Sequence, residues 1–303
     1  MAPKDSITPQ PKSVATSRRG ESTASSNSNN GKLDGDAAAL RASPTALEVL
    51  AELFSPALRF LDGVGSTVQL TAQTLYWLFR RPFRVGQVLA MMDFVGVQSL
   101  FIVSLTGAFS GMVLALQMIH AMRMFQAESM VGGVVVVSLT RELAPVFTGL
   151  MVTARVGSAM AAELGNMRVT EQIDAITTMS VSPVQYLLSP RMLAAVTMMP
   201  LLYIVYTIIG TVGAYVVSVM WLNVDPGIFV DKIRQFTQPA DMTMGFIKSA
   251  VFGFLISAIA CHEGFYASGG ARGVGIATTN AVVNSAVSLL IANYIITSLM
   301  TPM

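Results

Sequence analysis

Five long apolar segments, separated by shorter polar ones, constrain this chain most. About 20 apolar residues in an α-helix cross the hydrocarbon core of a bilayer, and a backbone in lipid must satisfy its own hydrogen bonds, so helices are expected. Only 12% of the 303 residues are charged, about half the share in a typical soluble domain. We therefore predict an all-α membrane protein. The expected spans are approximately residues 94–119, 134–162, 192–222, 244–260 and 276–300.

The region before the first span has two parts. Residues 1–44 are rich in Ser, Thr, Asn, Pro and Gly, and this composition buries too little apolar surface to offset the entropy of ordering, which predicts a disordered tail. Residues 45–92 carry apolar side chains at helical spacing, with Arg80 and Arg81 close to Trp77. That pattern is typical of an amphipathic helix at headgroup level, although an ordinary helical pair packed on another element is the alternative. Residues 45–303 then form one membrane domain.

The arginines that precede the first span predict the orientation of the chain. Positive charge next to a span favours the cytoplasmic side. Five crossings from a cytoplasmic start place the connections near 163–191 and 262–275 inside, and those near 120–133 and 225–243, with the C-terminus, outside.

The second span contains charged residues, namely Arg141, Glu142, Arg155 and Glu163. A charge within a membrane span costs roughly 2.5–3.5 kcal/mol on insertion scales, so such residues usually pair or serve a pathway. Arg141 and Glu142 can pair with each other or with neighbouring helices. Alternatively, Glu142 faces a water-filled cavity and contacts a polar headgroup. Arg155 must pair or extend toward the membrane surface, and Glu163 is one candidate partner.

Small residues recur every fourth position in the first two spans, a spacing that allows helix backbones to approach closely in lipid. Tight packing within one subunit and a contact between two subunits both explain it. The residues are Gly107, Gly111 and Ala115 in the first span and Gly149, Thr153, Gly157, Ala161 and Gly165 in the second.

A short polar helix is predicted directly after the second span, in the sequence TEQIDAITTM at 170–179. Thr170 is a candidate N-cap, and Glu171 and Asp174 fall in the first turn. A helix of about ten residues is marginal alone, so it must lean on another surface. It transmits force from a cytoplasmic partner or simply connects two spans, and the pattern fits both.

Motifs for catalysis or cofactor binding are missing from the sequence. No GxxxxGK[ST] sequence occurs, so ATP hydrolysis would require another polypeptide, and the glycines of 268–285 do not match a dinucleotide site and predict a tight turn. The two histidines lack companions at ligand spacing, Cys261 is the single cysteine, and the net charge of +2 does not favour nucleic acid. We expect no metal, no cofactor, no nucleic-acid partner and no enzymatic activity of the chain itself.

Three sequence blocks together resemble the MlaE/YrbE permease family. They are LTRELAPVFTGLMVTARVGSAMAAELGNMRVTEQIDAITTMSVSPVQYLLSPR at 139–191, GGARGVGIATTNAVV before the last span, and SGMVLALQ at 110–117. The resemblance extends over residues 45–303. It implies a homodimeric permease of five-span protomers, each with an N-terminal interfacial helix, in an ABC-type phospholipid transporter. Lipid would move between the cytoplasmic membrane and an extracytoplasmic MCE-domain protein, driven by a separate ATPase.

The resemblance also implies two sets of site residues. A lipid cavity would be lined by Leu114, Met122, Phe125, Glu142 and Leu143, and the ATPase would contact Glu171, Gln172, Asp174 and Ile176. The expected location is a bacterial inner membrane, with the plastid envelope as a second possibility. The rival hypotheses are a secondary transporter or channel, for which no internal repeat is clear, and a non-transporting scaffold for an MCE protein.

Overall fold

The computed structural model describes residue 63, residues 65–77 and residues 85–300, and the described residues form helices and turns without any strand. The expected tail at 1–44 and most of the expected interfacial segment lie outside the described residues. Of that segment, residues 65–77 are helical. Leu70 on this helix is buried, and Ser66 Oγ lies 2.8 Å from Nε2 of His262.

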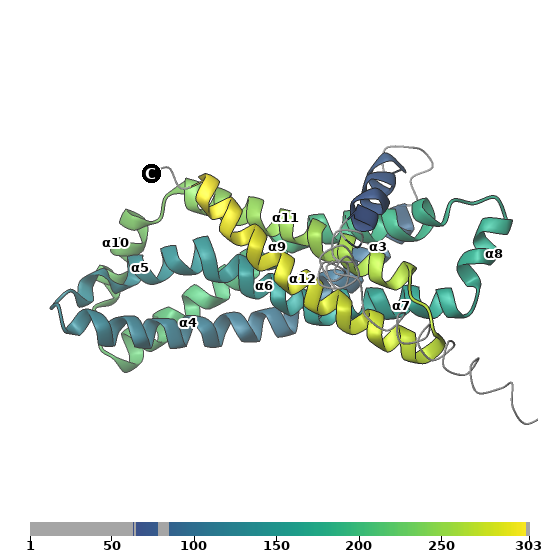
Figure 1. Ribbon diagram of the computed structural model, residues 1–303. Helices are drawn as coiled ribbons and strands as arrows, with labels where there is room; N and C mark the ends of the chain where they lie inside the picture. Colours follow the sequence, from purple (N-terminus) through teal and green to yellow (C-terminus); the bar gives the residue numbers. More distant parts are fainter. Residues whose placement is uncertain (1–62, 64, 78–84, 301–303) are drawn as a thin grey trace, which may run out of the picture. The chain divides into compact units, whose positions relative to one another are not determined.

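Five helices in the described part of the chain are long and apolar enough to cross a membrane, which confirms the predicted all-α membrane class (Figure 1). Each begins before the predicted span, because a helix can continue past the hydrocarbon where polar residues are tolerated. The first long helix therefore includes residues 85–92, which the sequence pattern assigns to the interfacial segment 45–92. The five helices are Val85–Arg123, Glu128–Val169, Val184–Trp221, Pro239–Phe265 and Gly270–Met300.

The first three long helices are composed of shorter α-helical pieces joined by 3-10 or π-helical turns. A π-helical turn accommodates one extra residue and often occurs at functional sites. The first consists of α3 (Val85–Val95), η1 (Val97–Ser99) and α4 (Leu100–Arg123). The second consists of η2 (Glu128–Met130), α5 (Val131–Ser138), η3 (Leu139–Leu143), α6 (Ala144–Val152), η4 (Thr153–Gly157) and α7 (Ser158–Val169). The third consists of η5 (Val184–Leu188), α9 (Ser189–Tyr215) and η6 (Val216–Trp221).

Two short helices mark the two ends of this bundle, and the last two long helices, α11 (Pro239–Phe265) and α12 (Gly270–Met300), are each uninterrupted. Helix α8 (Gln172–Thr178) follows α7, and α10 (Pro226–Phe236) follows the third long helix at the opposite end (Figure 1). The turn between α11 and α12 shares the α8 end. The turn after α4 and the end of α12 share the α10 end. The connections near 163–191 and 262–275 thus share one end of the bundle and those near 120–133 and 225–243 share the other, as predicted (Figure 1).

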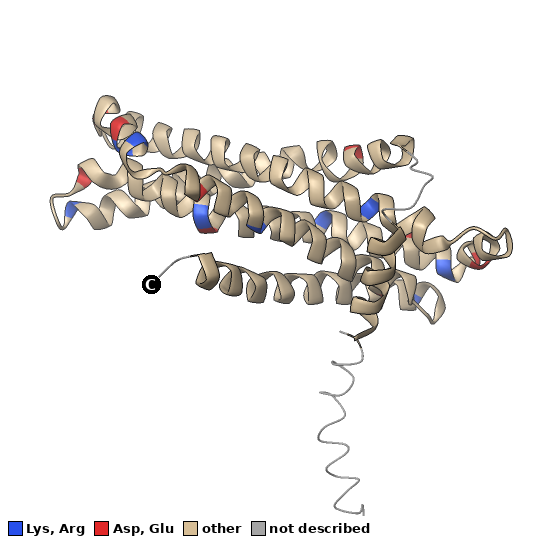
Figure 2. Ribbon diagram, turned by 90° about the horizontal axis from the view of Figure 1, so that it is seen from above, with Lys and Arg blue, Asp and Glu red and all other residues tan. Residues whose placement is uncertain are grey.

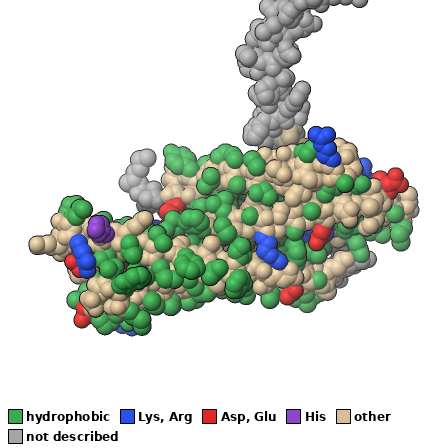
Figure 3. Space-filling view, turned by 90° about the horizontal axis from the view of Figure 1, so that it is seen from below, with side chains coloured by type: hydrophobic (Ala, Val, Ile, Leu, Met, Phe, Trp, Pro, Cys, Tyr) green, Lys and Arg blue, Asp and Glu red, His purple; other side chains and the backbone are tan. Residues whose placement is uncertain are grey.

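Helix α9 occupies the centre of the bundle, where it packs against α4 on one side and α11 on the other. The outer surface is also apolar: large hydrophobic side chains cover much of the face in Figure 3, and the long helices in Figure 2 carry few charges along their lengths. Helices that are apolar all round are typical of membrane spans. The main buried cluster includes Val103, Leu139, Met199, Tyr206, Phe252 and Ile256.

The small residues of the first span allow α4 and α9 to touch. A Cβ atom on Gly111 would overlap the backbone of Gly210, and one on Gly107 would meet the carbonyl oxygen of Tyr206 at 3.0 Å. In the second span, Gly149 lies against Leu289 of α12. The described contacts therefore support the explanation by tight packing within one chain.

Only the start of the glycine-rich segment forms the predicted tight turn between α11 and α12. Residues 270–285 of that segment, part of which the prediction also placed in the turn, belong to α12. Gly269 and Gly270 have φ angles of +94° and +67°, a region that other residues adopt only with strain. The two glycines let the chain reverse direction at the α8 end.

Candidate functional site

The charged pair Arg141 and Glu142 lies in the π-helical turn η3, directly before Pro145. Proline has no backbone N–H, so it cannot donate to the carbonyl oxygen four residues earlier. Here that oxygen belongs to Arg141, and it accepts a hydrogen bond of 2.9 Å from Nζ of Lys248. The backbone group that Pro145 leaves without its helical donor is therefore satisfied by a side chain from α11.

Lys248 also pairs with Glu142, whose carboxylate is the centre of a polar group that we call the Glu142 cluster: Glu142, Lys248, Asn293 and Thr297. The side chain of Lys248 is 0% exposed, and its Nζ lies 2.8 Å from Oε1 of Glu142. From α12, Asn293 Nδ2 donates to Oε2 of Glu142 at 3.1 Å. The single hydroxyl proton of Thr297 is shared between the Asn293 carbonyl oxygen at 2.8 Å and Oε1 of Glu142 at 3.2 Å. Three long helices thus meet at one carboxylate, which satisfies the buried ammonium.

The Glu142 side chain nevertheless remains 39% exposed, and Oδ1 of Asn293 beside it is buried without a hydrogen-bond partner in the described structure. A carboxylate has more acceptor sites than these contacts use. The Glu142 cluster therefore retains acceptor capacity that no described group uses.

Arg141 pairs with a different partner, Asp241 in the first turn of α11. Its Nη2 atom lies 2.5 Å from Oδ1 of Asp241, whose side chain is 2% exposed. The other carboxylate oxygen of Asp241 accepts from the backbone N–H of Gln238 at 2.9 Å and caps α11. Of the two predicted arrangements for Arg141 and Glu142, the structure shows pairing with neighbouring helices rather than with each other.

The proposed cavity residues on the first long helix lie along α4 and the turn that follows it. Leu114 and Met122 are half-buried and pack against the cluster around Ile119, about 12 Å apart at 1.5 Å per residue. Phe125 lies in the turn after α4 and is 78% exposed. Helix α4 packs against α5 and α6, which flank the turn η3 that carries Glu142 and the half-buried Leu143.

Helix α8 begins differently from the prediction. Thr170 is not its N-cap, because the Thr170 hydroxyl donates to the carbonyl oxygen of Asn166 and ends α7. Glu171 takes the N-cap position with a left-handed φ of +58° and makes no side-chain cap. The chain turns sharply at Glu171, which separates α8 from α7.

One side of α8 is anchored and the other is exposed. Ile173 is buried in a cluster with Leu164 of α7 and Leu188 of η5, and Ile176 packs partly against the same cluster. The expected ATPase contacts Glu171, Gln172 and Asp174 are exposed, whereas Ile176 is half-buried.

An ion pair adds to this anchor. Arg168 Nη1 lies 2.7 Å from Oδ1 of Asp174, with both side chains largely exposed. Such a surface pair contributes about 0–1 kcal/mol. Ile173 is therefore the stronger attachment of α8 to the bundle.

The deeper arginine, Arg155, does not pair with Glu163. Its guanidinium donates to the Phe94 carbonyl oxygen at 3.1 Å and to Oγ of Ser99 at 2.8 Å, which ties the second long helix to the junction of α3 and α4. Glu163 instead pairs with Arg191 at 2.9 Å. The suggestion that Glu163 is the partner of Arg155 is therefore wrong.

Four residues of this polar region were missed by the sequence reasoning: Asp241, Lys248, Asn293 and Thr297. A signal was present for Lys248, because an ionisable residue within an apolar span is costly and demands a partner. Asn293 and Thr297 lie one helical turn apart. Because neutral polar residues in a span can occur without an ionic partner, the sequence did not mark these two as site residues.

The comparison with known proteins agrees with this architecture. The profile of the family described as "Permease MlaE" matches residues 88–299. A probable ABC transporter permease protein of Rickettsia conorii is 45% identical over 241 residues, 80% of this chain and 93% of that protein. The intermembrane phospholipid transport system permease protein MlaE of Haemophilus influenzae is 39% identical over 210 residues, 69% of this chain and 80% of that protein. The chloroplastic protein TRIGALACTOSYLDIACYLGLYCEROL 1 of Arabidopsis thaliana is 36% identical over 235 residues, 77% of this chain and 67% of that protein. This chain, in which the described residues form five long apolar helices and residues 88–299 match the family profile, belongs to the MlaE permease family.

Proposed function

We propose that the chain is the membrane-spanning permease subunit of an ABC-type phospholipid transporter. The names of its relatives support the class of transporter and of cargo: an ABC transporter permease in Rickettsia conorii and an intermembrane phospholipid transport permease in Haemophilus influenzae. The chain itself contributes a path for lipid and no hydrolysis.

The observation that carries this proposal is the position of α8. It joins the second and third long helices, exposes Glu171, Gln172 and Asp174, and is anchored through Ile173. An element with one exposed polar side and one buried side suits a contact with a separate ATPase. Because the sequence has no phosphate-binding loop of the GxxxxGK[ST] type, the energy of ATP must reach the chain through such a contact.

In this mechanism, the second long helix links the ATPase contact to the lipid. Closure of the ATPase displaces α8, and α7 transmits the displacement through the π-helical turns η4 and η3 to the Glu142 cluster. Glu142 receives a polar headgroup, while Leu114, Met122, Phe125 and Leu143 contact the acyl chains. Narrowing of this region moves the lipid onward.

The proposed orientation of the chain in the membrane assigns a place to each of the other partners. The α8 end faces the cytoplasm, and an extracytoplasmic MCE-domain protein docks at the α10 end. Two copies of the chain form the working permease in a bacterial inner membrane. The similarity to a chloroplastic protein keeps the plastid envelope as the alternative location.

Charge reversal on α8 tests the proposal. In the complex with its ATPase and MCE protein, Glu171→Lys is expected to lower lipid-stimulated ATP hydrolysis and ATP-dependent lipid transfer roughly tenfold. Close charge pairs at an interface contribute from about 1.5 kcal/mol, and about 1.4 kcal/mol corresponds to a factor of ten. Asp93→Lys is the matched control, because Asp93 is an exposed acid on α3, outside both α8 and the α10 end where the MCE protein is proposed to dock.

Each hypothesis gives a different result in this assay. Full coupling in Glu171→Lys would count against α8 as the ATPase contact. Lipid transfer that persists without ATP would support the secondary transporter or channel, and a complex that never transfers lipid would support the scaffold.

A further inference from the structure

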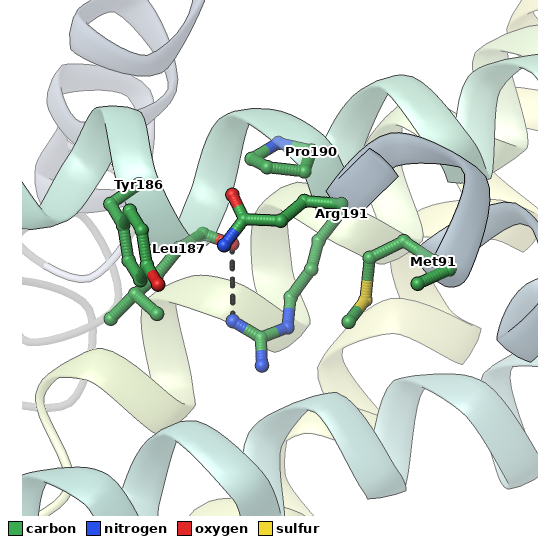
Figure 4. A pocket seen from close by; sticks show the side chains of 7 residues that line it. Met91, Tyr186, Leu187, Pro190 and Arg191 are labelled. Carbon is green, nitrogen blue, oxygen red and sulfur yellow. Dashed lines mark hydrogen bonds between the residues drawn. The ribbon is translucent and has the colours of Figure 1, made fainter. Parts of the chain in front are cut away.

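A pocket of about 100 Å³ lies near the α8 end, between the first and the third long helices (Figure 4). In this view the guanidinium of Arg191 lies between Tyr186 and Met91. The pocket is distinct from the Glu142 cluster: Arg191 pairs with Glu163 of the second long helix, which lies 21 residues, or about 30 Å, beyond Glu142 along that helix. Its lining includes Gln87, Met91, Tyr186, Leu187, Pro190 and Arg191.

Arg191 is 5% exposed and uses only part of its hydrogen-bonding capacity within the described structure. Nη1 donates to the Leu187 carbonyl oxygen at 3.1 Å and Nη2 donates to Oε2 of Glu163 at 2.9 Å. The remaining Nε–H group is buried and has no partner among the described residues. A buried donor on a cation is costly to leave unpaired, so this one calls for an acceptor.

Gln87 supplies a second buried polar atom to the pocket. Its Oε1 atom is buried and, in the described part of the chain, accepts no hydrogen bond. A molecule that fills the pocket must therefore accept from Arg191 and donate to Gln87. A phosphate next to a hydroxyl or ammonium group meets both needs, and guanidinium is a preferred partner of phosphate.

The surroundings favour a phosphate that belongs to a lipid. Most of the pocket wall is apolar, with Met91, Leu187 and Pro190 beside the two polar groups. Next to the pocket, α3 exposes Val85 and Leu89, and exposed apolar side chains on a membrane helix can contact acyl chains. A free anion would gain nothing from that apolar surface.

We infer that this pocket binds the headgroup of one phospholipid, with the phosphate on Arg191 and a headgroup hydroxyl or ammonium on Gln87. The placement of this lipid in the cytoplasmic leaflet rests on the proposed function, which puts the α8 end in the cytoplasm. Tyr186 and Leu187 belong to the same cluster as Ile173 of α8. The bound lipid therefore contacts the part of the bundle that α8 displaces.

Photolabelling tests this site without ATP or partners. The full chain is placed in vesicles of phosphatidylglycerol and phosphatidylethanolamine with a trace of phosphatidylglycerol that carries a diazirine on the headgroup. After illumination, mass spectrometry measures the label on peptides that contain Met91 or Tyr186. Gln87→Leu is expected to lower this label roughly three- to tenfold, as the loss of one buried hydrogen bond predicts. Gln117→Leu on the exposed side of α4 is the matched control.

A second variant keeps the test informative if Gln87→Leu does not fold. Ala90→Trp places a bulky ring at the edge of the pocket and is expected to reduce the label by a similar factor. Equal labelling in wild type, Gln87→Leu and Ala90→Trp would overturn the inference, as would the absence of label from both peptides. Loss of label on addition of 10-fold more inorganic phosphate than lipid would assign the pocket to a free anion instead. ATP-driven lipid transfer is measured separately, in the complex with the ATPase and MCE protein. If the chain is labelled at this pocket but its complex transfers no lipid with ATP, the proposed function is refuted and this site still stands.

Discussion

Replacement of Lys248 by methionine measures what the buried ammonium contributes. Nζ lies 2.8 Å from Glu142 Oε1 and 2.9 Å from the Arg141 carbonyl oxygen, and the lysine side chain is fully buried. Breaking a fully buried ion pair by removing one partner costs about 3–5 kcal/mol. Glu142 is partly exposed and keeps its bonds from α12, so we expect Lys248→Met to lower the free energy of unfolding by less, about 2–3 kcal/mol.

The reciprocal variant Glu142→Gln should cost more than Lys248→Met. It leaves the fully buried ammonium of Lys248 without a counter-charge, which places its cost in the upper range of about 3–5 kcal/mol. In the double variant neither charge is left alone. We therefore expect a coupling energy of about 2 kcal/mol between the two positions, well above the average of about 0.6 kcal/mol for a hydrogen bond between membrane helices.

The assay is reversible unfolding of the full chain in mixed micelles by titration with sodium dodecyl sulfate, followed by circular dichroism. Thr297→Val is the matched control, since it removes an uncharged donor that the same carboxylate shares with the Asn293 carbonyl oxygen, and it should cost about 0.6 kcal/mol. Additive effects of Lys248→Met and Glu142→Gln, within about 0.5 kcal/mol, would refute the argument that the two charges depend on each other.

Two further predictions concern helix packing and use the same unfolding assay. Gly111→Ala should cost about 2–3 kcal/mol, because the new Cβ would overlap the Gly210 backbone and force α4 away from α9. Gly157→Ala is its control, with the nearest atom at an ordinary 3.5 Å, and it should be neutral or stabilising by up to about 1 kcal/mol; equal effects of the two would contradict the packing argument. Arg155→Met should cost about 2–3 kcal/mol through lost charged hydrogen bonds at the α3–α4 junction, and a cost below about 0.5 kcal/mol would show that this link is unimportant.

The five spans could be predicted because the bilayer imposes both a length and a polarity on each segment. Their ends could not, since a helix that leaves the hydrocarbon obeys local capping. The N-terminus of α8 illustrates this: Thr170 has the right residue type for a cap, yet its hydroxyl bonds back to α7 and the sharp turn falls at Glu171. A choice between two adjacent caps depends on backbone geometry that residue type does not encode.

The partners of the charged residues were harder to predict, because they come from distant parts of the chain. Arg155 and Glu163 are eight residues apart on one helix, which separates them by about 12 Å along the axis. Each therefore finds a partner elsewhere, Arg155 near Ser99 and Glu163 at Arg191. The sequence shows that a charged residue within a span needs a partner. Which residue serves as that partner depends on how the helices pack.

In the proposed mechanism α8 acts on the whole bundle, and its packing gives the physical basis for this role. A seven-residue helix has little stability of its own, and its ion pair with Arg168 is exposed and weak. Ile173, however, is buried in one cluster with residues of α7, η5 and α11, so it packs into side chains that come from three long helices. Because close-packed side chains cannot be compressed, a displacement of α8 must be taken up by those helices. The apolar contact thus attaches α8 to the bundle, while its polar face stays exposed and, under the proposed function, meets the ATPase.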